Sequence, residues 1–195
     1  MKFKYLWFVL PFLFLACEDD TADADVAATV IGSWNVTSQH EYENSGCTGT
    51  YESALDSIQM FLGSDASLTW DFTEAQATQT LTADVTGESL CDMLTEGIGN
   101  LNGTNCEFDF YGYNLSWPID TFCVDMGGAY TNGNCNIVDA FTMDYTVDND
   151  IITFTEFAGT DSVETTTGTF NIAADVLTVT VSDDSSCVII TASKQ

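Results

Sequence analysis

The chain has 195 residues, of which 30 are acidic and 3 are lysine, with no arginine and a formal net charge of −27 at pH 7. This composition excludes nucleic-acid binding, which needs many Lys and Arg side chains to neutralise phosphates, and it excludes an arginine clamp on an anionic ligand. An apolar content of 45% over this length fits one globular domain with a core of its own.

The first 16 residues have the pattern of an export signal. Lys2 and Lys4 are followed by about a dozen apolar residues, fewer than the roughly 20 that a membrane-spanning helix needs. The apolar run ends with the residues Leu-Phe-Leu-Ala-Cys, of which the last is Cys17, and the next three residues are acidic. This resembles the lipobox of bacterial lipoproteins, in which the cysteine carries the lipid and becomes the mature N-terminus, although Phe14 stands where leucine is usual. The acidic residues after Cys17 resemble the surface-export signal of Bacteroidetes-type lipoproteins.

The resemblance implies that residues 1–16 are removed and that the lipid on Cys17 anchors the exported protein to the bacterial outer membrane, exposed at the surface. An ordinary signal peptide with an incidental cysteine is the alternative. Loss of the two N-terminal lysines would take the formal charge from −27 to −29. Residues 17–28, which are small and acidic, are then a solvated tether, and residues 29–195 form the folded domain.

The chain has seven cysteines, and an odd number usually indicates a free thiol or an intermolecular bond. Assigning Cys17 to the lipid leaves an even number, which in an exported chain predicts three disulfides. No Cys-x-x-Cys spacing occurs and His40 is the only histidine, so we predict no metal site. The remaining cysteines are Cys47, Cys91, Cys106, Cys123, Cys135 and Cys187.

From residue 29 onward, Thr, β-branched and aromatic residues alternate between turns rich in Gly, Asn and Asp, which is typical of antiparallel strands. The first predicted strand is Val30–Tyr42, in which alternation places Trp34 and His40 on the same face. Three further strands are predicted in the first half: Ser57–Leu62 and Ala66–Thr73, joined as a hairpin, and Thr78–Val85.

One helix is predicted, over Glu88–Glu96, because leucines recur at helical spacing before two glycines. Residues 100–136 are predicted to be an irregular, disulfide-rich insertion. Strands with tight polar turns and no alternating helices then predict an all-β fold, an antiparallel up-and-down β-barrel of about 8–10 strands. The five strands of the second half are Asp139–Val147, Ile151–Phe157, Val163–Ile172, Val176–Ser182 and Cys187–Ser193.

The beginning and the end of the domain carry a resemblance to a known family. Gly32 and Trp34 form a Gly-x-Trp opening, and the last strand ends near Lys194. This resembles the lipocalin-like domain of Bacteroidetes lipoproteins. In the wider lipocalin group the tryptophan plugs one end of the barrel and a cation from the last strand lies across it, an interaction of roughly 0.5–2 kcal/mol. The resemblance implies these roles for Trp34 and Lys194; an unrelated β-sandwich is the alternative.

A barrel of this kind also implies one disulfide. Its first and last strands pair antiparallel, so Cys47, just after the first strand, would face Cys187 at the start of the last one. The other four cysteines would then pair among themselves, with Cys123–Cys135 favoured among the alternatives.

Catalytic and metal-binding alternatives have weak support. The carboxylates could include a glycosidase pair, but their abundance makes proximity uninformative. Acidic turns such as residues 148–150 offer oxygen ligands without the EF-hand pattern, so we expect loosely bound divalent cations at most. His40 is expected to be a core residue rather than a ligand. We therefore predict no catalytic residue, no cofactor and no enzyme activity, with a hydrolase as the third alternative.

The predicted function is the binding of a small apolar or amphipathic ligand in the barrel, with Trp70, Phe72 and Phe154 as candidate lining. The alternative is a structural or adhesive surface domain, in which the aromatic stretch of the insertion, including Trp117, contacts glycans or proteins.

Overall fold

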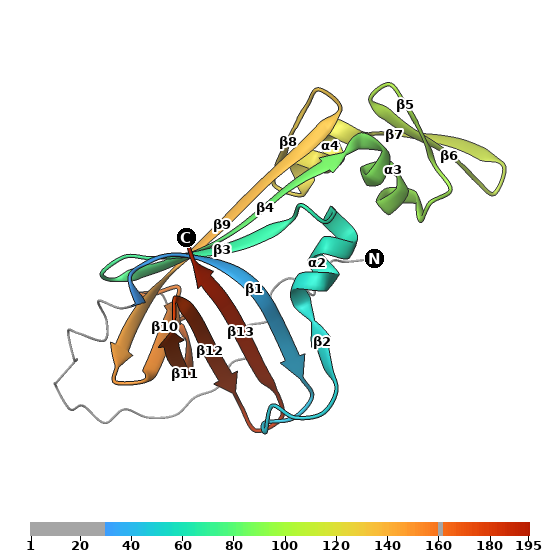
Figure 1. The fold of residues 1–195 in the computed structure, drawn as a ribbon. Coiled ribbons are helices and arrows are strands. Elements are labelled where there is room, and N and C mark those ends of the chain that lie inside the picture. Colours follow the sequence, from blue (N-terminus) through green and yellow to red (C-terminus); the bar gives the residue numbers. More distant parts are fainter. Residues whose placement is uncertain (1–29, 160–161) are drawn as a thin grey trace. The chain divides into compact units, whose positions relative to one another are not determined.

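The computed structural model describes residues 30–159 and 162–195, which form two compact units (Figure 1). Within the described residues, the first unit comprises those up to 53, 69–79 and those from 141 onward, and the second comprises 54–68 and 80–140. The second unit therefore takes in more of the chain than the insertion expected at residues 100–136. None of the helices in these described ranges is long and apolar enough to cross a membrane.

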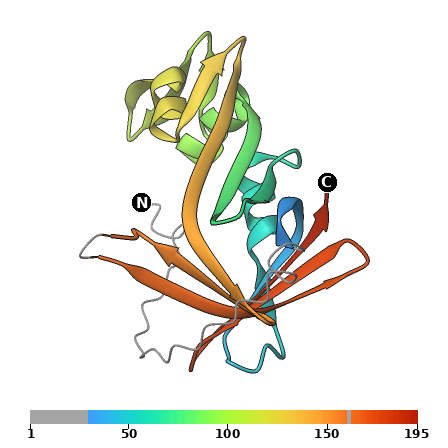
Figure 2. The same cartoon turned by 90° about the vertical axis from the view of Figure 1, so that its left-hand side faces the viewer.

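Eight strands pair into a closed antiparallel β-barrel, which confirms the predicted all-β fold. Strands pair in the order β10-β11-β12-β13-β1-β3-β4-β9, and β9 pairs in turn with β10, so the barrel has no open edge. Figure 2 shows β10–β13, coloured orange to red, running beside one another. The strands are β1 (Gly32–Tyr42), β3 (Ser67–Phe72), β4 (Gln76–Thr86), β9 (Asn134–Asp148), β10 (Ile151–Glu156), β11 (Glu164–Ala173), β12 (Val176–Ser182) and β13 (Cys187–Lys194).

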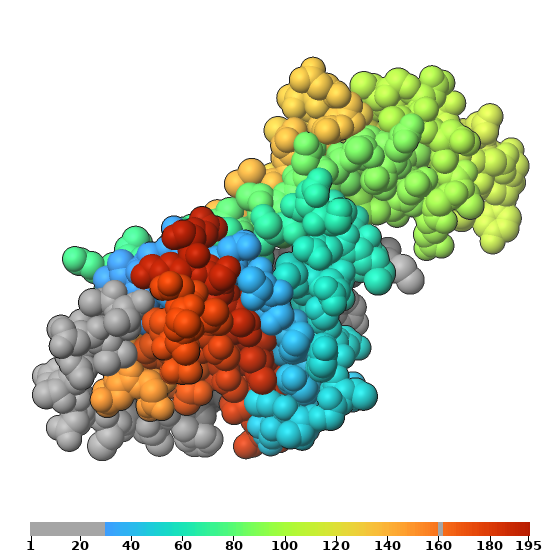
Figure 3. Space-filling view, in the orientation of Figure 1, coloured from blue at the N-terminus to red at the C-terminus, as the bar shows by residue number. Residues whose placement is uncertain are grey.

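The barrel closes between its first and last strands, whose residues lie side by side in the space-filling view (Figure 3). Trp34 is the register partner of Lys194, and Tyr42 is the partner of Cys187. A disulfide joins Cys47 to Cys187. It is the bond that the pairing of first and last strands implies. The short strand β2 (Tyr51–Ser53) pairs with the last residues of β1.

A β-bulge interrupts the alternation of side chains in β1. The register with β13 shifts between Val36 and Ser38, so Thr37 is an extra residue in β1. Before the bulge, Trp34 and Val36 face into the barrel and are buried. After it, the inward positions pass to the opposite set of residues, because side chains alternate with a period of two.

The bulge therefore reverses the expected position of His40. Gln39 and Glu41 pair with inward-facing residues of β13, whereas His40 lies on the outer face. The His40 ring stacks on Tyr51 of β2, with 4.0 Å between ring centroids. The prediction that His40 shares a face with Trp34 and belongs to the core is wrong, because strict alternation was assumed across an irregular strand.

The second unit combines three short helices with small sheets. Strands β5, β6 and β7 form a separate three-stranded sheet, and β8 pairs with the first part of β9. The further elements are α2 (Ala54–Leu62), α3 (Gly87–Thr95), β5 (Asn100–Asn102), β6 (Asn105–Phe110), β7 (Tyr113–Pro118), α4 (Ile119–Asp125) and β8 (Gly128–Thr131).

The predicted strand Ser57–Leu62 is wrong, because these residues belong to helix α2. Leu55, Ile58 and Leu62 are spaced three and four residues apart, which places them on one side of a helix. Leu55 is buried, and the other two pack against the core of the second unit. Gly63 ends the helix with a φ of 100°, a conformation that favours glycine.

Helix α3 lies within one residue of the prediction at each end, and the hydroxyl of Thr86 caps it by accepting a hydrogen bond from the N–H of Ser89 (3.2 Å). The prediction of a single helix is wrong, since the described residues also contain α2 and α4. Helix α4 lies in the stretch predicted to be irregular. Its signal was present in the sequence, because Ile119, Phe122 and Cys123 have helical spacing directly after Pro118.

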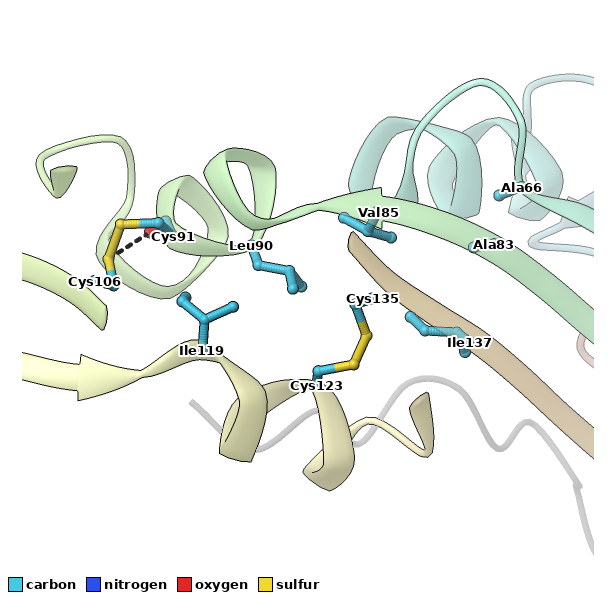
Figure 4. Close-up of a cluster of buried hydrophobic side chains, with 10 residues drawn as sticks. All are labelled: Ala66, Ala83, Val85, Leu90, Cys91, Cys106, Ile119, Cys123, Cys135 and Ile137. Carbon is cyan, nitrogen blue, oxygen red and sulfur yellow. Dashed lines mark hydrogen bonds between the residues drawn. A yellow bond between two sulfur atoms is a disulfide. The ribbon is translucent and has the colours of Figure 1, made fainter. Parts of the chain in front are cut away.

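The core of the second unit is built around two disulfides. Cys91–Cys106 joins α3 to β6, and Cys123–Cys135 joins α4 to β9. Leu90 and Ile119 lie between them and are fully buried (Figure 4). Residues 100–136 are therefore held in ordered strands and a helix, because each disulfide ties a helix to a strand.

Asp183 holds the turn between β12 and β13. Its carboxylate accepts hydrogen bonds from the backbone N–H groups of Ser185 (2.6 Å) and Ser186 (2.7 Å) and from both serine hydroxyls (3.0 and 2.9 Å). The bond from the Ser185 N–H is the largest influence. Because these donors favour the ionised carboxylate, they lower the pKa of Asp183 to about 2.

Asp183→Asn is expected to lower the free energy of unfolding by about 1 kcal/mol at pH 7, a figure that allows for solvent screening of this exposed carboxylate. The folded-state pKa is below the ordinary value of 3.8, so this contribution is present above about pH 4 and is lost as the pH falls towards 2. Urea unfolding at pH 7 and at pH 2 measures the free energy of unfolding of the wild-type protein and of Asp183→Asn. The difference between the two proteins should be smaller at pH 2 than at pH 7. Asp184→Asn, at the exposed neighbouring residue, should leave stability unchanged; an equal loss in both variants would contradict the role of Asp183.

Candidate ligand-binding site in the barrel

Four buried aromatic side chains pack together in the barrel. The ring of Phe154 (β10) lies 5.3 Å from that of Trp70 (β3), and Phe72 (β3) lies 5.2 Å from Tyr145 (β9), both edge to face. Trp70 and Phe72 also contact each other, at 5.5 Å. The structure thus brings together Trp70, Phe72 and Phe154, the three residues predicted to line a ligand site. The four rings are in mutual contact and form one aromatic cluster inside the barrel.

The tryptophan of the opening motif, Trp34, is buried inside the barrel beside Lys194. Trp34 is 0% exposed, and its indole N–H donates to the carbonyl oxygen of Val30 at 2.8 Å. The Nζ of Lys194 lies 5.4 Å from the centre of the Trp34 ring, within the range of a cation–π interaction. Gly32 lies beside this lysine with a φ of 131°, a backbone conformation that favours glycine; a Cβ there would be in ordinary contact with Cε of Lys194, at 3.6 Å. That Trp34 plugs the barrel, as the lipocalin resemblance implies, stays a prediction.

The inner wall at the opposite end is only half-buried. Beyond the bulge, Gln39 and Glu41 of β1 are paired with Ile190 and Val188 of β13, and all four are partly exposed. Glu164, the first residue of β11, faces inward at the same end and is also half-buried. Solvent therefore reaches the inner wall here, and that wall mixes aliphatic side chains with carboxylates. We call this end the acidic mouth.

Two buried polar atoms in the described residues have no hydrogen-bond partner, and both belong to the inner wall. They are Nε1 of Trp70 and Oε2 of Glu156. Phe154 connects them, because its ring contacts Trp70 and it precedes Glu156 by two residues on the same face of β10. A buried polar group without a partner costs about 1–3 kcal/mol, so each atom is a candidate for a hydrogen bond to a group from outside the described chain.

The carboxyl group of Glu156 is in an unfavourable place for a charge. The residue is 8% exposed and lies directly opposite Glu164 in the β10–β11 ladder. Burial raises the pKa of Glu156, and repulsion from the Glu164 carboxylate raises it further. The pair marks the acidic mouth as a region of concentrated negative charge.

Two hollows in the described residues lie outside the barrel. One, of about 210 Å³, lies on its outer surface among threonines of β11 and β12, and the other, of about 320 Å³, lies between α3 and β5. Neither is lined by Glu156 or Glu164. These two glutamates face each other across the β10–β11 ladder, but only Glu156 is buried, whereas a hydrolase would need a buried pair.

The remaining predicted residues lie elsewhere. Trp117 belongs to the second unit, where one face of the β6–β7 hairpin carries Phe108, Phe110, Tyr113 and Trp117. Phe108 is buried, whereas Phe110, Tyr113 and Trp117 are 54%, 73% and 45% exposed. The idea that it contacts glycans or proteins stays a prediction. Cys17 lies outside the described residues. Among the described residues, no group of three His, Cys, Asp or Glu side chains could hold a metal ion.

No match was found in comparisons with protein-family models, with curated proteins or with solved structures. The lipocalin resemblance therefore stays a prediction from the residues of the first and last strands.

Sequence reasoning did not single out Glu156 or Glu164. A signal was available, because Ile152, Phe154 and Glu156 alternate along one strand, and the first two are apolar. An acidic residue in phase with a buried apolar row faces the interior, which is unusual enough to indicate a functional position.

Proposed function

We propose that this protein is an exported lipoprotein, anchored to the outer membrane through Cys17, whose barrel binds one small amphipathic ligand at the acidic mouth. The observation that carries the proposal is Oε2 of Glu156, a buried polar atom on the inner wall of the mouth that has no hydrogen-bond partner. The ionised carboxylate can accept a hydrogen bond from a ligand.

The arrangement of the barrel supports binding at this end rather than in its middle. Trp34 at the other end is fully buried, and the aromatic cluster of Trp70, Phe72, Tyr145 and Phe154 is buried as well, whereas the mouth is partly exposed. At the mouth, the half-buried Val188 and Ile190 offer apolar surface beside the carboxylates. A ligand there would cover this apolar surface and bond to the wall with its polar part, which is the usual character of small-molecule sites.

Native mass spectrometry of the protein isolated from membranes of its own host tests both parts of the proposal. We expect the mass of a diacylglycerol-modified Cys17 on the polypeptide and a small molecule that dissociates on denaturation. Thr166→Trp, at a half-buried inward position of β11, should eliminate the bound molecule, whereas Thr165→Trp, its exposed outward neighbour, should retain it. Retention in both variants would overturn binding in the barrel, and an unmodified N-terminus downstream of Cys17 would overturn the lipid anchor.

A further inference from the structure

We propose that the ligand of the barrel is an amphipathic cation, whose protonated amine lies at Glu156 and Glu164 and whose apolar part lies along β12 and β13. This inference rests on the proposed function and specifies the chemical class of the ligand.

Glu156 provides the primary contact. It faces inward with Ile152 and Phe154, it is more than nine-tenths buried, and its Oε2 lacks a partner. Ionised carboxyl groups in such positions are normally paired, since an isolated buried charge is costly. A protonated amine supplies both the opposite charge and N–H donors for this oxygen.

The described protein provides no cation of its own at this end. Lys194 is the only Lys or Arg among the described residues, and it lies over Trp34 at the other end of the barrel. His40 faces outward, against Tyr51. The inward positions of the mouth instead hold three carboxylates, those of Glu41, Glu156 and Glu164. Their field attracts a positive ligand and repels an anionic one such as a fatty acid.

The surroundings favour an organic cation over a metal ion. No three acidic, His or Cys side chains of the described residues are close enough to one another to coordinate a metal. Beside the glutamates, β12 and β13 present Val181, Val188 and Ile190 to the interior, all half-buried. Aliphatic surface next to carboxylates fits an alkyl chain that ends in an amine, because both parts find a complementary environment.

Calorimetric titration with three probes of equal chain length tests the proposal. The probes are n-decylammonium, n-decanol and n-decanoate. The titrations are done at pH 7 in about 0.15 M salt, which screens the long-range attraction that the net negative charge of the protein exerts on any cation. We expect decylammonium to bind at least about tenfold more tightly than decanol, and decanoate to bind most weakly. Glu156→Gln should weaken decylammonium binding at least about tenfold and leave decanol binding unchanged. Glu74→Gln, which removes an exposed charge from the turn after β3, should change neither.

Each outcome has a separate meaning. Equal binding of decanol and decylammonium would overturn the amine site while leaving a ligand-binding barrel intact. Equal loss of decylammonium binding in Glu156→Gln and Glu74→Gln would show attraction by net charge alone and would also overturn the site. No binding of any probe by the wild-type protein would overturn the proposed function, and the inference with it.

Discussion

Replacing both Cys47 and Cys187 by alanine is expected to lower the free energy of unfolding by about 5 kcal/mol. The bond closes a loop with a sequence separation of 140, so its loss releases a large amount of chain entropy in the unfolded state. It also holds the loop after β1 against the start of β13, where the barrel closes. Urea unfolding of the oxidised proteins, followed by tryptophan fluorescence, measures the difference.

The disulfide Cys123–Cys135 provides the matched control for loop length. It spans a separation of only 12, so the double alanine variant should lose about 3 kcal/mol by the same loop-closure entropy. Cys123, Cys135 and Cys187 are buried and Cys47 is half-buried, so a greater loss in the long-range pair would not come from packing. A smaller loss for the long-range pair than for the short-range pair would contradict a stabilising role at the barrel seam.

Trp34→Ala is expected to lower the free energy of unfolding by about 3–5 kcal/mol. Three interactions disappear together: the burial of the whole indole, its hydrogen bond to Val30 and its contact with the Lys194 ammonium. Thermal and urea unfolding report the loss. Trp117→Ala, which removes the same side chain from a position that is 45% exposed, should cost less than about 1 kcal/mol. Similar losses in the two variants would show that Trp34 does not close the barrel.

Local patterns in the sequence predicted most of the barrel. Strands such as β12 carry apolar residues at every second position and end in polar turns, and each of these signals arises within a few consecutive residues. Helix α3 was predicted for the same reason, from leucines at helical spacing. Helix α2 was missed because a short apolar run fits either a helix or a strand when its length is the only guide. The bulge at Thr37 was missed because the extra residue is defined by the partner strand.

By itself, the sequence determined the all-β class, the six cysteines available for disulfides, and the positions of Trp34 and Lys194 in the first and last strands. It also supplied the export signal, which stays a hypothesis. Those features depend on residue order and composition. Only the tertiary structure decided that Glu156 lies opposite Glu164, that His40 turns outward, and that two inner-wall atoms have no partner. The reason is physical: cross-strand register and hydrogen-bond satisfaction depend on neighbours far apart in the chain, and no local pattern records which groups a buried carboxylate will meet.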